Sequence, residues 1–184
     1  MTEFHRPISD SYWVEPGRLL AGEYPGKHDQ ELTRQRIDRL IEAGFDTFID
    51  LTKSGETFPY VDILREESQV YEVNVTHQRF PIGDFGLPTP DLMNNLLDKI
   101  EEDLRAGRRI YLHCWGGIGR TGTTVGCYLV RQGKSPNEAL DQLSAWWRRV
   151  PKSLYHPYSP ETQEQVNFIR SWIEKDAKLR KLGK

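Results

Sequence analysis

The chain has 184 residues, of which 28% are charged, and its formal net charge is −2 at pH 7. This size suits one domain, and this charge gives no general attraction to nucleic acid or to a membrane surface. No apolar run approaches the roughly 18 residues that cross a bilayer, and the first ten residues lack the apolar stretch of a secretion signal. We therefore expect a cytoplasmic monomer that binds neither nucleic acid nor membrane.

The chain contains two cysteines, Cys114 and Cys127. Two thiols do not make a disulfide framework, and their spacing, together with scattered histidines, matches no zinc motif. No metal site is therefore predicted. Cys127 falls among apolar residues of a predicted helix, where we expect a buried thiol, with a redox pairing to Cys114 as the alternative.

The first half of the chain alternates between strand and helix patterns. Residues 12–26 carry Pro-Gly punctuation and predict a hairpin, and residues 29–44 place apolar side chains at helical spacing before a final glycine. The apolar run 45–52 predicts a buried strand. Residues 54–68 predict a loop with some helix, and residues 70–82 predict a second strand with alternating apolar positions.

The second half follows a loop rich in glycine and proline. Residues 89–107 predict a helix with Thr89 as its cap, and residues 109–114 predict a short buried strand. Three helical patterns follow, over residues 120–133, 135–150 and 159–175. Strands that alternate with helices predict an α/β fold, with a central, mainly parallel, twisted sheet of four or five strands and helices on both faces. We expect one domain over residues 1–184, with a compact core at 12–172 between a short N-terminal arm and a basic C-terminal tail.

Residues 113–121 read HCWGGIGRT and lie where a predicted strand ends and a predicted helix begins. A glycine-rich turn at this point presents backbone N–H groups and a helix dipole to an anion. The Walker A loop does not fit, because its leading glycine falls on Cys114 and its lysine on Arg120. Residues 117–122 match the dinucleotide pattern G-x-G-x-x-G, but no second strand with an acidic residue follows.

A cysteine and an arginine near the two ends of this turn fit a phosphate-binding loop. The turn can close around a tetrahedral anion, because the small residues at positions 116, 117 and 119 let the backbone approach closely. The planar guanidinium of Arg120 can bind two phosphate oxygens at once. A helix N-terminus beside arginine favours the thiolate form of a cysteine, so Cys114 is predicted to present a nucleophile to phosphorus.

The loop resembles the signature His-Cys-x-x-Gly-x-x-Arg-Thr of the cysteine-based protein tyrosine phosphatase superfamily and matches each fixed position. The rest of the chain is similar to the dual-specificity branch. The resemblance implies that Cys114 forms a cysteinyl-phosphate, that Thr121 donates a hydrogen bond to the thiolate, and that His113 behind the loop helps to keep the sulfur ionised. It implies no metal and no cofactor, because the loop amides and Arg120 stabilise the transition state. The implied phosphate-binding residues are Trp115, Gly116, Gly117, Ile118, Gly119 and Arg120.

The family also requires a general acid on a loop near the nucleophile. Asp84, in the stretch FPIGDFGLP, fits this role because it precedes Cys114 by 30 residues and has glycines on both sides. The alternative for Asp84 is a solvated turn residue. Asp91 is its rival, but a position directly after Thr89 and a proline suits the first turn of a helix. Asp50 ends a strand, where we expect a structural role.

Gln165 resembles the glutamine with which some tyrosine-specific members place the hydrolytic water. Those members carry a further glutamine where this chain has Glu161, which weakens the comparison. The amide of Trp115 lines the predicted loop, so its side chain must leave the loop and either pack below it or reach the rim.

The loop indicates a phosphate monoester but does not identify the molecule that carries it. Its variable positions hold no lysine, unlike those of lipid-directed relatives, and we find no long tyrosine-recognition insert. We expect a phosphorylated protein or peptide as the substrate, with phosphotyrosine and phosphoserine or phosphothreonine admitted, and phosphate, vanadate or sulfate as loop ligands. Two alternatives remain open: a phosphatase of phosphoinositides, RNA 5′-ends or small metabolites, and a non-catalytic phosphate-binding module.

Overall fold

The structure is a computed structural model that describes residues 5–173. Within these residues a five-stranded sheet has the order β1-β2-β5-β3-β4. β1 pairs antiparallel with β2, and the other neighbours pair in parallel, so the predicted mainly parallel sheet is confirmed. The strands are β1 (Ser11–Glu15), β2 (Leu19–Gly22), β3 (Thr47–Asp50), β4 (Thr76–Arg79) and β5 (Ile110–His113).

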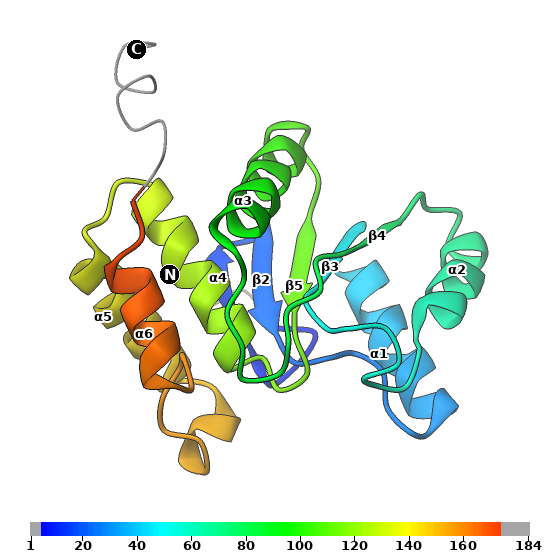
Figure 1. The fold of residues 1–184 in the computed structure, drawn as a ribbon. Helices are drawn as coiled ribbons and strands as arrows, with labels where there is room; N and C mark the ends of the chain where they lie inside the picture. Colours follow the sequence, from blue (N-terminus) through cyan, green and yellow to red (C-terminus); the bar gives the residue numbers. More distant parts are fainter. Residues whose placement is uncertain (1–4, 174–184) are drawn as a thin grey trace.

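Helices cover both faces of this sheet, as Figure 1 shows. α1 and α2 lie on one side, and α4, α5 and α6 lie on the other, with α3 packed beside α4. The helices are α1 (Gln30–Glu42), α2 (Val61–Val70), α3 (Pro90–Arg105), α4 (Gly119–Arg131), α5 (Pro136–Trp147) and α6 (Gln163–Arg170), with a 3-10 turn, η1, at Pro151–Leu154. The α/β class with helices on both faces is therefore confirmed.

Neighbouring residues of the central strands supply two separate hydrophobic cores. Phe48 and Tyr111 pack against α1 and α2, whereas Ile49 and Leu112 pack on the side of α3 to α6. Successive side chains of a strand point to opposite faces, so two short strands feed both cores. Ile8 is also buried against the first core, and packing therefore begins before residue 12. The basic tail at residues 175–184 lies outside the described residues.

The capping residues explain which helices could be placed from the sequence. Thr89 accepts a hydrogen bond from the backbone N–H of Leu92, and Ser135 forms a reciprocal capping box with Glu138. Gly44, just after α1, has a φ of +83°, which a glycine adopts without strain. α2 begins after Tyr60 with no side-chain cap. Because the sequence carries no capping residue there, its pattern over residues 54–68 indicated a loop with only some helix.

The strand predicted over residues 70–82 is shorter in the structure. β4 covers Thr76–Arg79, because α2 continues to Val70 and Glu72 then reverses the chain with a φ of +54°. Val70 and Val73, the apolar residues that favoured a longer strand, lie exposed on the surface. The alternation of apolar residues was therefore misleading there.

The register of the sheet places four strand ends in one row. Asp50 lies opposite Arg79 on one side and His113 on the other, and His113 lies opposite Gly22. In a parallel α/β sheet this carboxyl edge is where ligands bind. The segments that follow β2, β3 and β5 therefore meet at one place.

Candidate active site

The loop that follows β5 connects Cys114 to the first turn of α4. Gly117 has a φ of +75°, and a Cβ at this position would lie 2.5 Å from the carbonyl carbon of Gly22. Only glycine fits this turn, because both the conformation and the close approach of the end of β2 exclude a side chain. The glycine-rich sequence thus lets the loop close against the neighbouring strand.

Hydrogen bonds to the loop carbonyls orient its backbone. The Trp115 carbonyl accepts from the N–H of Tyr24 at 2.9 Å, and the Ile118 carbonyl accepts from Ser159 Oγ at 2.9 Å. Lys152 Nζ donates to the Gly116 carbonyl at 3.1 Å. The backbone N–H groups of residues 115–118 donate to no partner within residues 5–173. With the carbonyls held by surrounding groups, these amides are left available to an anion.

Cys114 is a buried thiol at the base of a cleft of about 390 Å³. The same cleft is lined by Gly119, Arg120 and Asp84, and so contains all three predicted catalytic residues. Cys127 is also buried, eight residues into α4 from Gly119. Eight residues correspond to about 12 Å along the helix axis, so Cys127 lies about two turns beyond the start of α4.

The guanidinium of Arg120 is held by two acids and a carbonyl. Nη1 donates to Glu56 Oε2 at 2.9 Å and to the Ile82 carbonyl at 3.1 Å. Nη2 donates to Glu56 Oε1 at 2.6 Å and to Asp84 Oδ1 at 3.0 Å. Burial lowers the pKa of Arg120, but the Glu56 hydrogen bonds and the negative charges of Cys114, Glu56 and Asp84 outweigh it and raise that pKa overall.

Glu56 is a site residue that the sequence did not predict. It lies in the loop between β3 and α2, where its backbone N–H and carboxylate bond back to Lys53. Burial raises the pKa of Glu56, but the hydrogen bonds from Arg120 and Lys53 lower it below its ordinary value. A glutamate in a polar loop gives no sequence signal, because its partner is 64 residues away.

Asp84 lies on the loop between β4 and α3, with its side chain 48% exposed to solvent. The N–H of Gly86 donates to the Gly83 carbonyl at 2.8 Å, which makes this loop a tight turn around Asp84. Phe85 takes a φ of +55°, a strained conformation for a bulky side chain. Asp91, the alternative to Asp84 as general acid, is an exposed first-turn residue of α3 and does not line the cleft.

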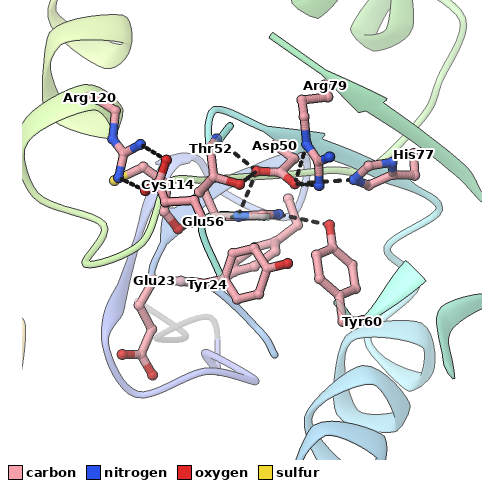
Figure 2. A network of polar contacts seen from close by, with 12 residues as sticks. Glu23, Tyr24, Asp50, Thr52, Glu56, Tyr60, His77, Arg79, Cys114 and Arg120 are labelled. Carbon is pink, nitrogen blue, oxygen red and sulfur yellow. Dashed lines mark hydrogen bonds and ion pairs between the residues drawn. The ribbon is translucent and has the colours of Figure 1, made fainter. Parts of the chain in front are cut away.

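A buried polar network lies behind the loop, and Figure 2 shows Asp50 at its centre. Asp50 Oδ1 accepts from the N–H and hydroxyl of Thr52, at 2.8 and 2.6 Å. Its Oδ2 accepts from Arg79 Nη2 at 2.8 Å and lies 3.4 Å from His77 Nε2. Burial raises the pKa of Asp50, but the hydrogen bonds from His77 and Thr52 and the nearby His113 hold it well below its usual range.

His113 links this network to the nucleophile. Its Nδ1 lies 3.3 Å from the Cys114 carbonyl and its Nε2 lies 2.8 Å from the Tyr60 hydroxyl. A carbonyl only accepts, so Nδ1 carries the proton and Nε2 accepts from Tyr60. Burial lowers the pKa of His113 to about 4, although Asp50 opposes the shift. His113 is therefore neutral at pH 7 and holds Cys114 through its carbonyl, not through a charge.

Two predicted accessory residues take different places. Thr121 is buried, and its hydroxyl has no hydrogen-bond partner among residues 5–173, so the bond to the thiolate is not formed in this structure. Gln165 is also buried. Its Oε1 accepts from the N–H of Glu161 and of Thr162, and its Nε2 donates to the Gly86 carbonyl at 3.3 Å. Gln165 therefore ties α6 to the loop that carries Asp84.

The mouth of the cleft is rich in aromatic side chains. Phe58, Phe85 and Trp115 all line it and are each more than half exposed. This answers the open question about Trp115, whose side chain reaches the rim and does not pack beneath the loop. Exposed aromatic groups around a concave polar site offer an apolar surface to whatever carries the bound anion.

We also searched residues 5–173 for metal-ion sites and for membrane-spanning helices. No cluster of three or more histidine, cysteine, aspartate or glutamate side chains there could hold a metal ion. None of the helices in that range has the length and apolar character needed to cross a membrane.

Comparison with known proteins agrees with this geometry. A family model described as "PTP-SAK: Swiss Army Knife protein, DSP-PTPase phosphatase domain" matches residues 9–175. Cyclin-dependent kinase inhibitor 3 of Rattus norvegicus is 33% identical over 182 residues, covering 92% of this chain and 80% of the rat protein. Protein MJECL20 of Methanocaldococcus jannaschii is 28% identical over 106 residues, covering 57% of this chain.

Among solved structures, the crystal structure of Tk-PTP in the active form aligns with a TM-score of 0.66 and 27% identity, covering 89% of this chain and 98% of that one. The matched part of MJECL20 is 65% of its length, and the chain spans less than half the length of several other curated relatives. The matched family model spans nearly all of the sequence, including both the sheet and the Cys114 loop. The chain therefore belongs to the dual-specificity branch of the cysteine-based protein tyrosine phosphatase superfamily, a family of phosphoester hydrolases.

Proposed function

We propose that this protein hydrolyses phosphate monoesters on tyrosine, serine or threonine side chains of proteins, with phosphotyrosine as the best substrate. The observation that carries the proposal is the meeting of Cys114, Arg120 and Asp84 in one cleft with an aromatic rim. Binding alone would require neither a nucleophile nor an acid. The proposal therefore assigns Cys114, Arg120 and Asp84 as catalytic residues.

The first step transfers the phosphoryl group to sulfur. Cys114 Sγ forms a bond to phosphorus while the bond between phosphorus and the substrate oxygen breaks. Protonated Asp84 gives its proton to that leaving oxygen. The amides of residues 115–120 and the guanidinium of Arg120 bind the equatorial oxygens as negative charge develops.

The second step releases phosphate. A water oxygen attacks phosphorus, the sulfur–phosphorus bond breaks, and Asp84 takes a proton from the water. The thiolate of Cys114 and protonated Asp84 are restored, and inorganic phosphate leaves. The buried amide of Gln165, with both of its ends already bonded, supports a role in positioning the Asp84 loop in place of the predicted contact with the hydrolytic water.

The contacts of Arg120 suggest how substrate binding prepares Asp84. All four N–H bonds of the two terminal nitrogens are used, three of them by Glu56 and Ile82 and one by Asp84. A phosphate that takes the Nε and Nη2 positions must replace Asp84, the half-exposed partner. The displaced carboxyl is then free to face the leaving oxygen of the substrate. Glu56 stays in place and keeps the guanidinium oriented.

The aromatic rim favours an aryl phosphate over a sugar or lipid phosphate. Stacking or edge contacts with Phe58, Phe85 or Trp115 stabilise the binding of a phenyl ring that enters the cleft. A serine side chain cannot make these contacts. A reducing compartment such as the cytoplasm suits an oxidisable thiolate, and this location is part of the proposal.

Phosphate release from a substrate panel tests the proposal. Matched phosphotyrosine, phosphoserine and phosphothreonine peptides are compared with a phosphoinositide, an inositol polyphosphate and an RNA 5′-phosphate. We expect the highest kcat/KM for phosphotyrosine, no turnover by Cys114→Ser, and retained binding of the phosphopeptide by that variant. A preference for inositol polyphosphate would overturn the protein-substrate assignment. No release from p-nitrophenyl phosphate at pH 5–7 with reductant would support the binding module instead.

A further inference from the structure

A second pocket adjoins the catalytic cleft on the side of α1. It has a volume of about 400 Å³ and shares Lys27 and His28 with the cleft. The other lining residues are Asp29, Leu32, Gln35, Arg36 and Arg39. The four helical members are spaced by three and four residues, so they form one face of α1. His28 also makes an edge-to-face contact with Phe58 at 5.0 Å, which joins the pocket to the aromatic rim.

One buried carboxylate fixes the cations of the wall between the two pockets. Glu23 follows β2 and is only 7% exposed. Its carboxylate lies 2.6 Å from Arg36 Nη2, 2.7 Å from Lys152 Nζ and 3.3 Å from Lys27 Nζ. Burial raises the pKa of Glu23, but these three cations lower it below its ordinary value. One anion among three cations leaves two positive charges in an ordered arrangement.

The pocket has unused capacity to donate hydrogen bonds to an anion. Arg36 uses Nε and Nη2 for protein contacts, and its Nη1 has no partner within residues 5–173. Arg39 is exposed and forms no ion pair with any residue in that range. Asp29 is the one acid of the lining, and its carboxylate caps α1 by accepting from the N–H groups of Glu31 and Leu32.

Asp84 and Glu161 also line the cleft, from the loops that precede α3 and α6. The excess of positive charge lies on the side of α1 and attracts an acidic side chain of a bound peptide. Leu32 and Gln35 add an apolar and an amide surface that suit the methylene stem and the carboxylate of a glutamate side chain. Because Lys27 and His28 line both pockets, a group bound there lies only a few residues from the phosphorylated side chain.

We propose that this pocket, centred on Lys27, Arg36 and Arg39, is a second subsite that binds an acidic side chain of the peptide near the phosphorylated residue. The inference rests on the proposed protein phosphatase function and adds a sequence preference to it. The subsite acts mainly through the binding of substrate and leaves the reacting atoms unchanged.

A scanning peptide library tests this subsite. Phosphotyrosine peptides carry glutamate or glutamine at each position within four residues of the phosphotyrosine, and kcat, KM and their ratio are measured. We expect glutamate on one side to raise kcat/KM about two- to fivefold, the range of a solvent-exposed ion pair, mostly through KM. The preference should shrink as ionic strength rises from 0.02 to 0.5 M.

Charge variants identify the pocket responsible. Arg39→Gln should remove most of the glutamate preference and Arg39→Glu should reverse it, where the preference is the ratio of kcat/KM for the glutamate peptide to kcat/KM for the all-glutamine peptide of the same variant. Arg65→Gln on α2 is the matched control: it removes the same charge from an exposed side chain outside both pockets, and it should keep the preference.

The outcomes separate the two proposals. If glutamate has no effect at any position, or if Arg39→Glu keeps the full preference, the subsite is wrong while the phosphatase assignment stands. If p-nitrophenyl phosphate is hydrolysed but no phosphopeptide is, the protein-substrate function is wrong and the subsite is rejected with it.

Discussion

Two polar clusters flank Cys114, and they differ in how exchangeable their contacts are. The buried cluster consists of Asp50, Thr52, His77, Arg79 and His113 behind the loop, and the cleft cluster consists of Glu56, Asp84 and Arg120 in front of it. Both pair carboxylates with bases. The side chains of Asp50 and His113 are 0% exposed, whereas those of Glu56 and Asp84 are 21% and 48% exposed.

Because of this difference in exposure, we expect substitutions in the buried cluster to lower stability and substitutions in the cleft cluster to lower turnover. Removing a partner of Asp50 or His113 leaves a polar group in a place that water does not reach, which costs several kcal/mol. In the cleft cluster, solvent or a phosphate oxygen can take the place of a removed partner at little cost. The buried cluster therefore fixes the shape of the loop, and the cleft cluster can exchange partners during the reaction.

The sharpest test makes the same substitution in both clusters. Asp84→Asn should lower kcat on phenyl phosphate about 10²–10⁴-fold, because a general acid is lost. A much smaller loss is expected with p-nitrophenyl phosphate, whose leaving group needs little protonation. Stability should change by less than about 0.5 kcal/mol in urea unfolding, since the side chain is half exposed. Equal losses for both esters would move the acid role to another residue.

Asp50→Asn should have the opposite profile. The amide cannot neutralise Arg79 or accept as many hydrogen bonds, so unfolding should become easier by about 3 kcal/mol. Activity per folded molecule should fall less than in Asp84→Asn. Urea midpoints and turnover measured on the same samples check this, and unchanged stability would contradict the role given to the buried cluster.

Acid should weaken the buried cluster before the cleft is affected. The pKa of His113 is about 4 in the folded protein, below the 6.5 of an ordinary histidine, so the unfolded chain binds a proton first as pH falls. The stability from neutral His113 is complete above pH 6.5 and is lost as pH falls from 6.5 toward 4, by about 3 kcal/mol at most. The lowered pKa of Asp50 extends the loss below pH 3.8. Urea unfolding at several pH values measures the slope, and His113→Asn should flatten it.

Glu56→Gln should have the smallest effect. It keeps the shape of the side chain but removes the charge that orients Arg120, so kcat/KM should drop about tenfold, the order expected for a hydrogen bond between charged groups. Vanadate affinity should fall with kcat/KM, because both depend on the guanidinium. An equal loss in Glu31→Gln, an exposed glutamate on α1, would show that net charge and not position is responsible.

Local signals predicted the parts of the fold that local chemistry decides. Thr89 and Ser135 mark helix starts because their side chains bond to amides only three residues away. The prediction failed over residues 70–82, where a turn at Glu72 and the end of α2 depend on how α2 packs against α1. An alternating apolar pattern cannot distinguish an edge strand from a helix end that packs on a neighbour.

The sequence by itself determined the Cys114 loop, because its nucleophile, glycines and arginine lie within a few residues and the loop conformation is set by glycine at position 117. Only the tertiary structure decided which acids meet Arg120 and which cations surround Glu23. The two acids come from loops after β3 and β4, which meet because a parallel sheet brings its strand ends to one edge. The cations come from the segment after β2, from α1 and from η1. Such long-range pairs leave no periodic trace in a single sequence.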